Sequence, residues 1–227
     1  MIILIRHGEA DHHVQNLTGG WTDSALTEKG RNQLQHLAGL LAREFQGHAR
    51  PFVAASDLVR AKEGAGFIAH ALGDVPVHCY EFLREKNNGR AAGLTVQEAR
   101  AFYHAPVTGR ELDHVNYDGG ETRRSFYQRT IAGAKALLER PEDIIIVSHK
   151  GTIQNILFYW LGLDIEEVAC KKISFDIRPA SLTVLGVNKW GERAVFVLND
   201  TGYLHGAQSL GLSSCQFAGQ APVFKKL

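Results

Sequence analysis

The sequence lacks the features that mark secreted and membrane-spanning proteins. Only three cysteines occur in 227 residues, an odd number at widely spaced positions, which argues against a disulfide scaffold and indicates a reducing compartment. No apolar run reaches the length of a transmembrane helix. The apolar stretch at residues 1–5 is too short for the core of a signal peptide, and a charged residue follows it at once. We therefore expect a cytoplasmic protein.

An excess of charge of one sign is also absent. The 25 Lys and Arg residues against 24 Asp and Glu residues give a net charge of +1, with no long basic or acidic block. Nucleic acids and anionic membrane surfaces are therefore poor candidates for partners. Hydrophobic residues make up 44% of the chain and charged residues 22%, which is the composition of a globular protein. The length predicts a single domain over residues 1–227, as a monomer or a homodimer.

Compact apolar runs predict six buried strands, at residues 2–5, 52–55, 75–80, 144–147, 182–187 and 194–198. Apolar residues at helical spacing lie between these runs, over residues 34–45, 58–72 and 153–160. Thr95 and Glu98 have the spacing of a capping box, which predicts a short helix. The alternation of buried strands with helices predicts an α/β fold with a doubly wound, mostly parallel sheet flanked by helices. The last two strands are close in sequence, which favours an antiparallel edge.

Two segments fall outside this alternation. Residues 86–120 combine glycines, one short helix and a polar loop, so we expect a lid-like insertion that caps the substrate. Residues 205–227 are rich in Gly, Ser and Ala, and we expect a loosely ordered C-terminal tail.

Side chains suited to phosphate chemistry follow four of the predicted strands. In chain order they are Arg6 and His7; Ser56, Asp57 and Arg60; Glu81, Arg84 and Glu85; and Ser148 and His149. Because the carboxyl ends of parallel strands meet at one edge of a sheet, one site could hold two histidines, two arginines and a carboxylic acid. Such a set can stabilise the charge of a phosphoryl group and supply a histidine nucleophile. Gly8, without a Cβ, would let the backbone turn sharply towards a bound group.

The order of these motifs resembles the histidine phosphatase superfamily, also called the phosphoglycerate mutase-like family. The similarity is carried by residues 6–9, 26–30, 56–61, 83–85, 119–122 and 147–149. Several independent motifs in the family's order make a coincidence improbable. The resemblance implies a metal-independent phosphomonoester hydrolase that needs no cofactor and acts on a small phosphorylated metabolite through a phosphohistidine intermediate.

The same resemblance implies three catalytic residues. His7 would attack phosphorus and become phosphohistidine, and His149 would help to surround the phosphoryl oxygens. Glu85 would protonate the leaving alcohol and then take a proton from the water that hydrolyses the intermediate. Glu81 lies nearby in the sequence and could hold the acid's role instead.

Three further residues are implied as phosphate-binding groups. Arg6 and Arg60 would offset the charge of the phosphoryl group, and Asn16 would add a neutral hydrogen bond. Lys150 departs from the family, which usually has a small residue there; it could add a cation near the phosphate or point to solvent. The other histidines, among them His12 and His13, are interpreted as structural or exposed.

Within the family, the alternative activity is that of a phosphoglycerate mutase-type phosphotransferase. A mutase must retain its phosphorylated intermediate and exclude water, which requires extra contacts to a small phospho-acid. Residues 85–93 lack the aromatic and basic run that follows the acid in the mutase branch. This segment therefore favours the phosphatase branch.

Two alternatives lie outside this chemistry. The stretch from His7 to His12 fits an H-x-E-x-D-H spacing, which some binuclear metal hydrolases use. That interpretation leaves Arg6 and Arg60 unexplained. A non-catalytic phospho-ligand binder on the same fold would lack the nucleophile or the acid, and the sequence has candidates for both.

Overall fold

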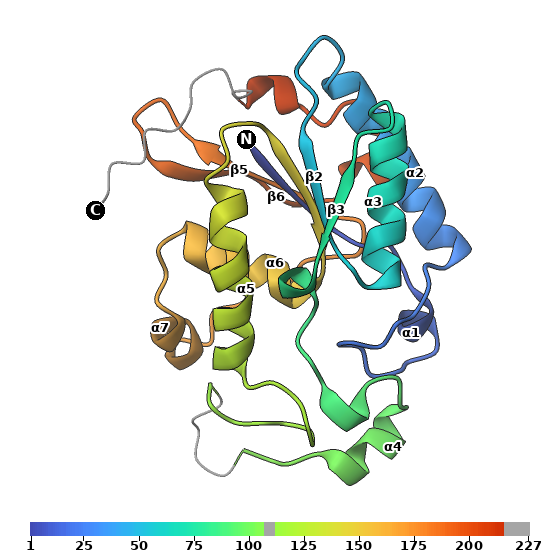
Figure 1. Cartoon of the computed structure of the whole chain (residues 1–227), viewed down its shortest axis with the longest axis vertical. Helices are drawn as coiled ribbons and strands as arrows, with labels where there is room; N and C mark the ends of the chain where they lie inside the picture. The colour runs from blue at the N-terminus through green and yellow to red at the C-terminus, as the bar shows by residue number, and fades with distance from the viewer. Residues whose placement is uncertain (107–111, 216–227) are drawn as a thin grey trace.

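The computed structural model describes residues 1–106 and 112–215, and the strands of this part form one six-stranded sheet in the order β3-β2-β4-β1-β5-β6 (Figure 1). The strands are β1 (Ile2–Arg6), β2 (Phe52–Ser56), β3 (Val77–Tyr80), β4 (Ile144–Ser148), β5 (Leu182–Val187) and β6 (Arg193–Asp200). The first four run parallel, β5 is antiparallel to β1, and β6 is antiparallel to β5. The predicted α/β fold and its antiparallel edge are confirmed. The third strand begins two residues later than predicted.

Helices cover both faces of the sheet (Figure 1). One face carries α2 (Glu28–Glu44) and α3 (Val59–Ala71), and the other carries α5 (Arg123–Leu138) and α6 (Lys150–Trp160). A further helix, α7 (Ile165–Cys170), packs against α6. The shorter helical elements are α1 (Asp11–Val14), α4 (Val96–Ala99), η1 (Glu81–Leu83), η2 (Gly89–Ala91), η3 (Arg100–Phe102), η4 (Gly202–His205) and η5 (Leu212–Ser214). In this part of the chain, no helix has the length and hydropathy needed to cross a bilayer.

The central strands are buried on both faces. In β1, Ile3 and Ile5 pack with α2 and α3, whereas Ile2 and Leu4 pack with α5 and α6. A strand covered on both sides is an unbroken apolar run rather than an alternating one. This is why the sequence pattern locates these strands so well.

The helix starts follow local capping rules. The Thr27 hydroxyl accepts a hydrogen bond from the amide of Gly30 at the start of α2. Thr95 and Glu98 form the predicted capping box of α4. Residue 149 occupies the N-cap position of α6, which therefore begins directly beyond the carboxyl end of β4.

Gly8 serves a close backbone crossing. A Cβ on Gly8 would lie 2.5 Å from the carbonyl oxygen of Gly30, and a Cβ on Gly30 would collide with the carbonyl of Glu9. The two glycines therefore let the first turn of α2 pass directly against the segment after β1. The expected turn of the backbone towards a bound group at Gly8 stays a prediction.

The predicted insertion at residues 86–120 contains η2, α4 and η3. In Figure 1, α4 lies at the bottom of the view, past the lower end of β3. Lys86 Nζ donates to Asn116 Oδ1 at 3.1 Å, and the guanidinium of Arg90 lies 4.3 Å from the ring centre of Phe102. These contacts join the two ends of the segment, and its capping of a substrate stays a prediction. Residues 107–111 of this segment, and 216–227 of the predicted tail, lie outside the described residues.

Candidate active site

The loop after β1 places the His7 side chain in the interior of the protein. The His7 amide donates to the carbonyl of Ser148 at 2.9 Å, and the His7 carbonyl accepts from the amide of Ala180 at 3.0 Å. The residue is 2% exposed. Burial lowers the pKa of His7 well below its ordinary value of 6.5, and the positive charges around the ring lower it further. The imidazole is therefore neutral at physiological pH.

The hydrogen bonds of His7 determine which ring nitrogen carries the proton. Nδ1 lies 2.8 Å from the carbonyl oxygen of Gly8, and a carbonyl can only accept, so Nδ1 is protonated. Nε2 in turn accepts from Nε of Arg60 at 3.3 Å. The lone pair of Nε2 therefore faces a guanidinium, on the ring edge opposite the main chain.

Arg60 reaches this position from the first turn of α3. Its Nη2 donates to the carbonyl of Gly20 at 2.8 Å, and its Nη1 donates to the carbonyl of Thr22. The residue is buried, and burial lowers the pKa of Arg60 to about 10, so the guanidinium remains charged at neutral pH. A charged donor group is thus held rigidly beside the His7 ring.

Arg6 supplies a second guanidinium from the end of β1. Its Nη1 donates to the carbonyl of Ile177 at 2.7 Å, and its Nη2 lies 3.0 Å from Nε2 of His13. Its Nε is buried and has no hydrogen-bond partner among the described residues. Burial lowers the pKa of Arg6, and the negative charges of Glu85 and Asp176 partly offset that effect. This guanidinium has an N–H group that is still available to an acceptor.

His149 faces His7 from the start of α6. The ring centres lie 5.1 Å apart, and the planes are inclined by 60°. The residue is fully buried, and neither of its ring nitrogens has a hydrogen-bond partner within the described part of the chain. Burial, and then the charge of Arg60, lower the pKa of His149 well below its ordinary value. Buried polar atoms without partners are costly, which indicates a site built for an incoming polar group.

The Glu85 carboxylate lies at the start of the same helix. Its Oε2 accepts from the amide of Gly151 at 3.0 Å, and its Oε1 accepts from the amide of Lys86 at 2.8 Å. A Cβ on Gly151 would collide with Oε1, so only glycine permits this approach. The alternative acid, Glu81, is exposed, and its carboxylate pairs with Nη1 of Arg84 at 3.0 Å.

Two histidines of α1 also belong to the cluster, and the sequence interpretation missed them. The ring of His13 stacks on that of His7 at 5.5 Å with planes inclined by only 12°, and the ring of His12 lies 6.1 Å from His7. Burial lowers the pKa of His12 to about 3 and that of His13 to about 4. Their position directly after the motif at residues 6–9 could have indicated this, because the segment that follows the motif must fold back over the end of β1.

Asn16 and Lys150 lie at the periphery. Asn16 is exposed, has a left-handed backbone with φ of 54°, and makes no side-chain hydrogen bond to the described residues. Its contact with phosphate stays a prediction. The ammonium group of Lys150 forms an ion pair with the exposed carboxylate of Asp176, and a role for it near the phosphate stays a prediction.

The spacing of the metal alternative does not produce a ligand cluster. The Glu9 carboxylate binds Lys29 Nζ at 2.8 Å and the Thr27 hydroxyl at 3.0 Å. Within residues 1–106 and 112–215, no group of three or more His, Cys, Asp or Glu side chains is arranged to hold a metal ion.

The arrangement as a whole suits a multiply charged anion. The guanidinium groups of Arg6 and Arg60, the unpartnered ring of His149 and the basic Nε2 of His7 gather in the described part of the chain, and both guanidinium groups feel the charge of Glu85. Donors of this kind can bind phosphoryl oxygens while the histidine lone pair reaches phosphorus.

Comparisons with known proteins point to one family. Residues 2–201 match the family model described as histidine phosphatase superfamily (branch 1). Phosphoglycerate mutase-like protein 4 of Arabidopsis thaliana is 30% identical over 161 residues, which cover 68% of each chain. A 2,3-bisphosphoglycerate-dependent phosphoglycerate mutase of Xanthobacter autotrophicus is 33% identical over 58% of this chain and 64% of its own length.

Solved structures show the same architecture. An alpha-ribazole phosphatase from Shigella flexneri superposes with a TM-score of 0.72 at 23% identity, over 92% of this chain and 98% of that one. A mycobacterial glucosyl-3-phosphoglycerate phosphatase, solved with VO3, gives a TM-score of 0.69 at 26% identity, over 88% of this chain and 98% of that one. The resemblance predicted from the sequence motifs is confirmed.

Proposed function

The chain belongs to the histidine phosphatase superfamily (branch 1), and on this basis we propose that it is a phosphomonoester hydrolase that works through phosphorylation of His7. The observation that carries the proposal is the tautomer of His7. With Nδ1–H bound to the Gly8 carbonyl and the pKa lowered, Nε2 holds an unprotonated lone pair at neutral pH. A nucleophile of this kind needs no separate base.

The first displacement forms a bond from Nε2 of His7 to phosphorus and breaks the bond from phosphorus to the ester oxygen. The electron pair leaves with that oxygen, which takes a proton from the carboxyl group of Glu85. Arg6, Arg60 and His149 donate to the phosphoryl oxygens as their charge redistributes. The products are a free alcohol and phosphohistidine.

The second displacement regenerates the enzyme. A water oxygen attacks phosphorus, the bond to Nε2 breaks, and its electron pair returns to His7. The Glu85 carboxylate takes a proton from the water and is ready to act as an acid again. The net reaction converts a phosphate monoester and water into an alcohol and inorganic phosphate.

His13 supports this chemistry by ordering two of the groups that perform it. Its ring is nearly parallel to that of His7, its Nε2 lies 3.0 Å from Nη2 of Arg6, and its Nδ1 accepts from the amide of Ala10 at 3.2 Å. Removing the His13 ring would free both neighbours to move.

The role of Asn16 as a neutral phosphate donor would require the loop after α1 to bring its side chain towards the substrate.

The experiment that tests the proposal compares the wild type with His7→Ala. We expect the variant to lose hydrolysis of p-nitrophenyl phosphate by more than about a thousandfold, as for the loss of other covalent nucleophiles. The wild type, quenched in alkali during turnover, should retain acid-labile phosphate that is absent from the variant. Full activity of His7→Ala would refute the mechanism.

Phosphoglycerate mutase activity is a second candidate because several relatives carry that name. A mutase returns the phosphoryl group to a phospho-acid, whereas a hydrolase gives it to water. Incubation with 3-phosphoglycerate and 2,3-bisphosphoglycerate distinguishes the two. We expect inorganic phosphate from monoesters and no catalytic formation of 2-phosphoglycerate; rapid interconversion without phosphate release would favour the mutase.

A further inference from the structure

We propose that Arg129 and Glu121 are positioning residues for proton transfer by Glu85, a role that rests on the proposed function. Nε and Nη2 of Arg129 donate to the two carboxylate oxygens of Glu121 at 2.6 and 2.9 Å. This is a two-point pair between a planar guanidinium and a carboxylate, the most directional ion pair in proteins. The two side chains are only 21% and 17% exposed.

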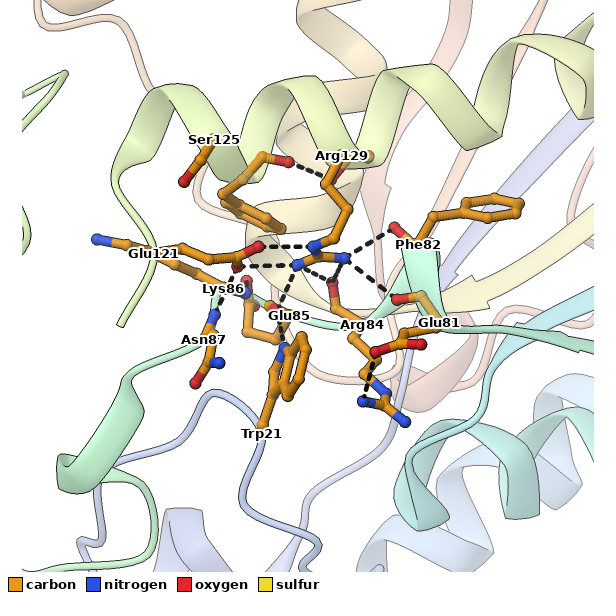
Figure 2. Close-up of polar contacts among 12 residues, drawn as sticks. Trp21, Glu81, Phe82, Arg84, Glu85, Lys86, Asn87, Glu121, Ser125 and Arg129 are labelled. Atoms are coloured by element: carbon orange, nitrogen blue, oxygen red, sulfur yellow. Dashed lines mark hydrogen bonds and ion pairs between the residues drawn. The ribbon is translucent and has the colours of Figure 1, made fainter. Parts of the chain in front are cut away.

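The remaining donors of Arg129 bind the main chain that carries the acid. Nη1 donates to the carbonyls of Glu81 at 3.1 Å and Phe82 at 3.2 Å, and Nη2 donates to the carbonyl of Glu85 at 3.0 Å (Figure 2). These carbonyls lie beyond β3, where the sheet no longer provides partners. One side chain from α5 therefore satisfies the backbone of the segment on the amino side of Glu85.

Glu121 binds the same segment on its other side. Its Oε2 accepts from the amide of Asn87 at 2.8 Å, and its own amide donates to the Asn87 carbonyl at 2.9 Å. Figure 2 shows the Glu121 carboxylate between Asn87 and Arg129. The pair thus holds the chain on both sides of Glu85, and the acid's Cα has little freedom to shift.

A third contact connects the acid to the phosphate-binding arginine. The indole Nε1 of Trp21 donates to the carbonyl of Glu85 at 2.8 Å, and the Arg129 guanidinium lies 5.6 Å from the indole centre. The carbonyls on either side of Trp21, those of Gly20 and Thr22, accept from Arg60. The main chain of residues 20–22 therefore joins the hydrogen bonds of Arg60 to the hydrogen bond that Trp21 makes with the main chain of Glu85.

The position of Glu85 matters because a general acid must lie within hydrogen-bond reach of the leaving oxygen. Its carboxylate is held by the amides of Lys86 and Gly151, which fix the direction of the side chain only while the main chain stays in place. Arg129 and Glu121 form hydrogen bonds with the main chain on both sides of Glu85. They do not themselves need to touch the substrate.

The test uses two leaving groups in the full-length protein. Arg129→Lys keeps the positive charge but cannot form two hydrogen bonds with the Glu121 carboxylate at once. Glu121→Gln keeps the shape of the side chain but removes its negative charge, which weakens the pair with Arg129. We expect each variant to lower kcat for glycerol 2-phosphate by about ten- to a hundredfold, the effect of a displacement of about 1 Å. We expect less than about a threefold loss for p-nitrophenyl phosphate, whose leaving group needs little protonation.

The matched control is Arg124→Lys. Arg124 lies on the same helix and pairs with Asp113 and Glu166, and no hydrogen bond among the described residues joins its side chain to residues 81–87. Its replacement should leave both substrates unchanged. Circular dichroism and thermal unfolding verify that the variants fold, and Glu121→Gln carries the test alone if Arg129→Lys does not.

The outcomes separate this proposal from the proposed function. Equal losses for both substrates in the folded variants, or no loss for either, would overturn the positioning role. If Glu85→Gln shows the leaving-group difference and the two positioning variants do not, only the positioning role fails. If His7→Ala retains activity, the proposed function fails first.

Discussion

Nε of Arg60 lies 3.3 Å from Nε2 of His7, although 53 positions of sequence separate them. The contact pairs the basic nitrogen of a neutral imidazole with a buried guanidinium. A phosphoryl group that enters between them would gain a charged donor at the same point where it meets the nucleophile. The first prediction concerns this contact.

Replacement of Arg60 by alanine should lower kcat/KM for an aryl phosphate by about a hundredfold or more, the usual cost of losing a transition-state donor. Arg60→Lys should lose less kcat/KM, because lysine keeps the positive charge although it lacks the planar guanidinium with its several donors. Alanine would also leave the carbonyls of Gly20 and Thr22 without their donor, which costs about 1–3 kcal/mol of unfolding free energy. Steady-state kinetics and urea unfolding measure both effects. Equal losses of kcat/KM in the two variants would contradict the role given to the charge.

Glu85→Gln should slow alkyl phosphates more than aryl phosphates. Glutamine cannot donate an acidic proton, so the loss for an alkyl ester should be about a hundredfold or more, whereas an activated aryl ester should lose about tenfold or less. The comparison is made on kcat with p-nitrophenyl phosphate and glycerol 2-phosphate. Glu81→Gln serves as the control, because that carboxylate is exposed and pairs with Arg84. A leaving-group difference in Glu81→Gln instead would transfer the acid's role to Glu81.

The buried histidines should make the protein sensitive to acid. In the folded state the pKa values of His7 and His149 lie well below 6.5, whereas the unfolded chain binds protons near pH 6.5. Unfolding therefore takes up protons, and the free energy of unfolding falls as the pH drops below about 6.5. Each fully buried histidine contributes about 1.4 kcal/mol per pH unit across this range.

His12 and His13 add contributions that end near pH 3 and pH 4, where their folded-state pKa values lie. Urea unfolding at several pH values between 7 and 5 measures the slope. His149→Asn should reduce the slope, because it removes a fully buried imidazole. A flat profile in the wild type would show that the imidazoles are not held neutral by the fold.

His13→Phe separates stacking from hydrogen bonding. Phenylalanine can keep a ring against His7 but loses the polar contacts of His13 with Nη2 of Arg6 and with the amide of Ala10, and leaving a buried polar group without its partner costs about 1–3 kcal/mol. We expect kcat/KM to fall by about ten- to a hundredfold. Asn16→Gly preserves the left-handed backbone and tests the predicted neutral hydrogen bond to phosphate, whose loss should lower kcat/KM by about five- to tenfold. An unchanged kcat/KM in Asn16→Gly would contradict a phosphate contact from Asn16.

Much of the fold could be predicted from local sequence because its strands are buried on both faces. The five residues of β4 are all buried, and this apolar run stands out from the polar residues on either side of it, Glu142 and Asp143 before it and His149 and Lys150 after it. The errors lay at the ends. The strand predicted at residues 75–80 begins at Val77, since the residues before it belong to the turn after α3.

The sequence by itself determined which chemical groups gather at the sheet's edge. Parallel strands all end at the same side, so Arg6, His7 and His149 had to meet once their strands were assigned. Only the tertiary structure decided how the groups are oriented. The tautomer of His7, the stacking of His13, the pairing of Lys150 with Asp176 and the hold of Arg129 on the acid's main chain depend on contacts between separate elements. Such contacts follow from how helices and loops pack in three dimensions, which no periodicity along the chain records.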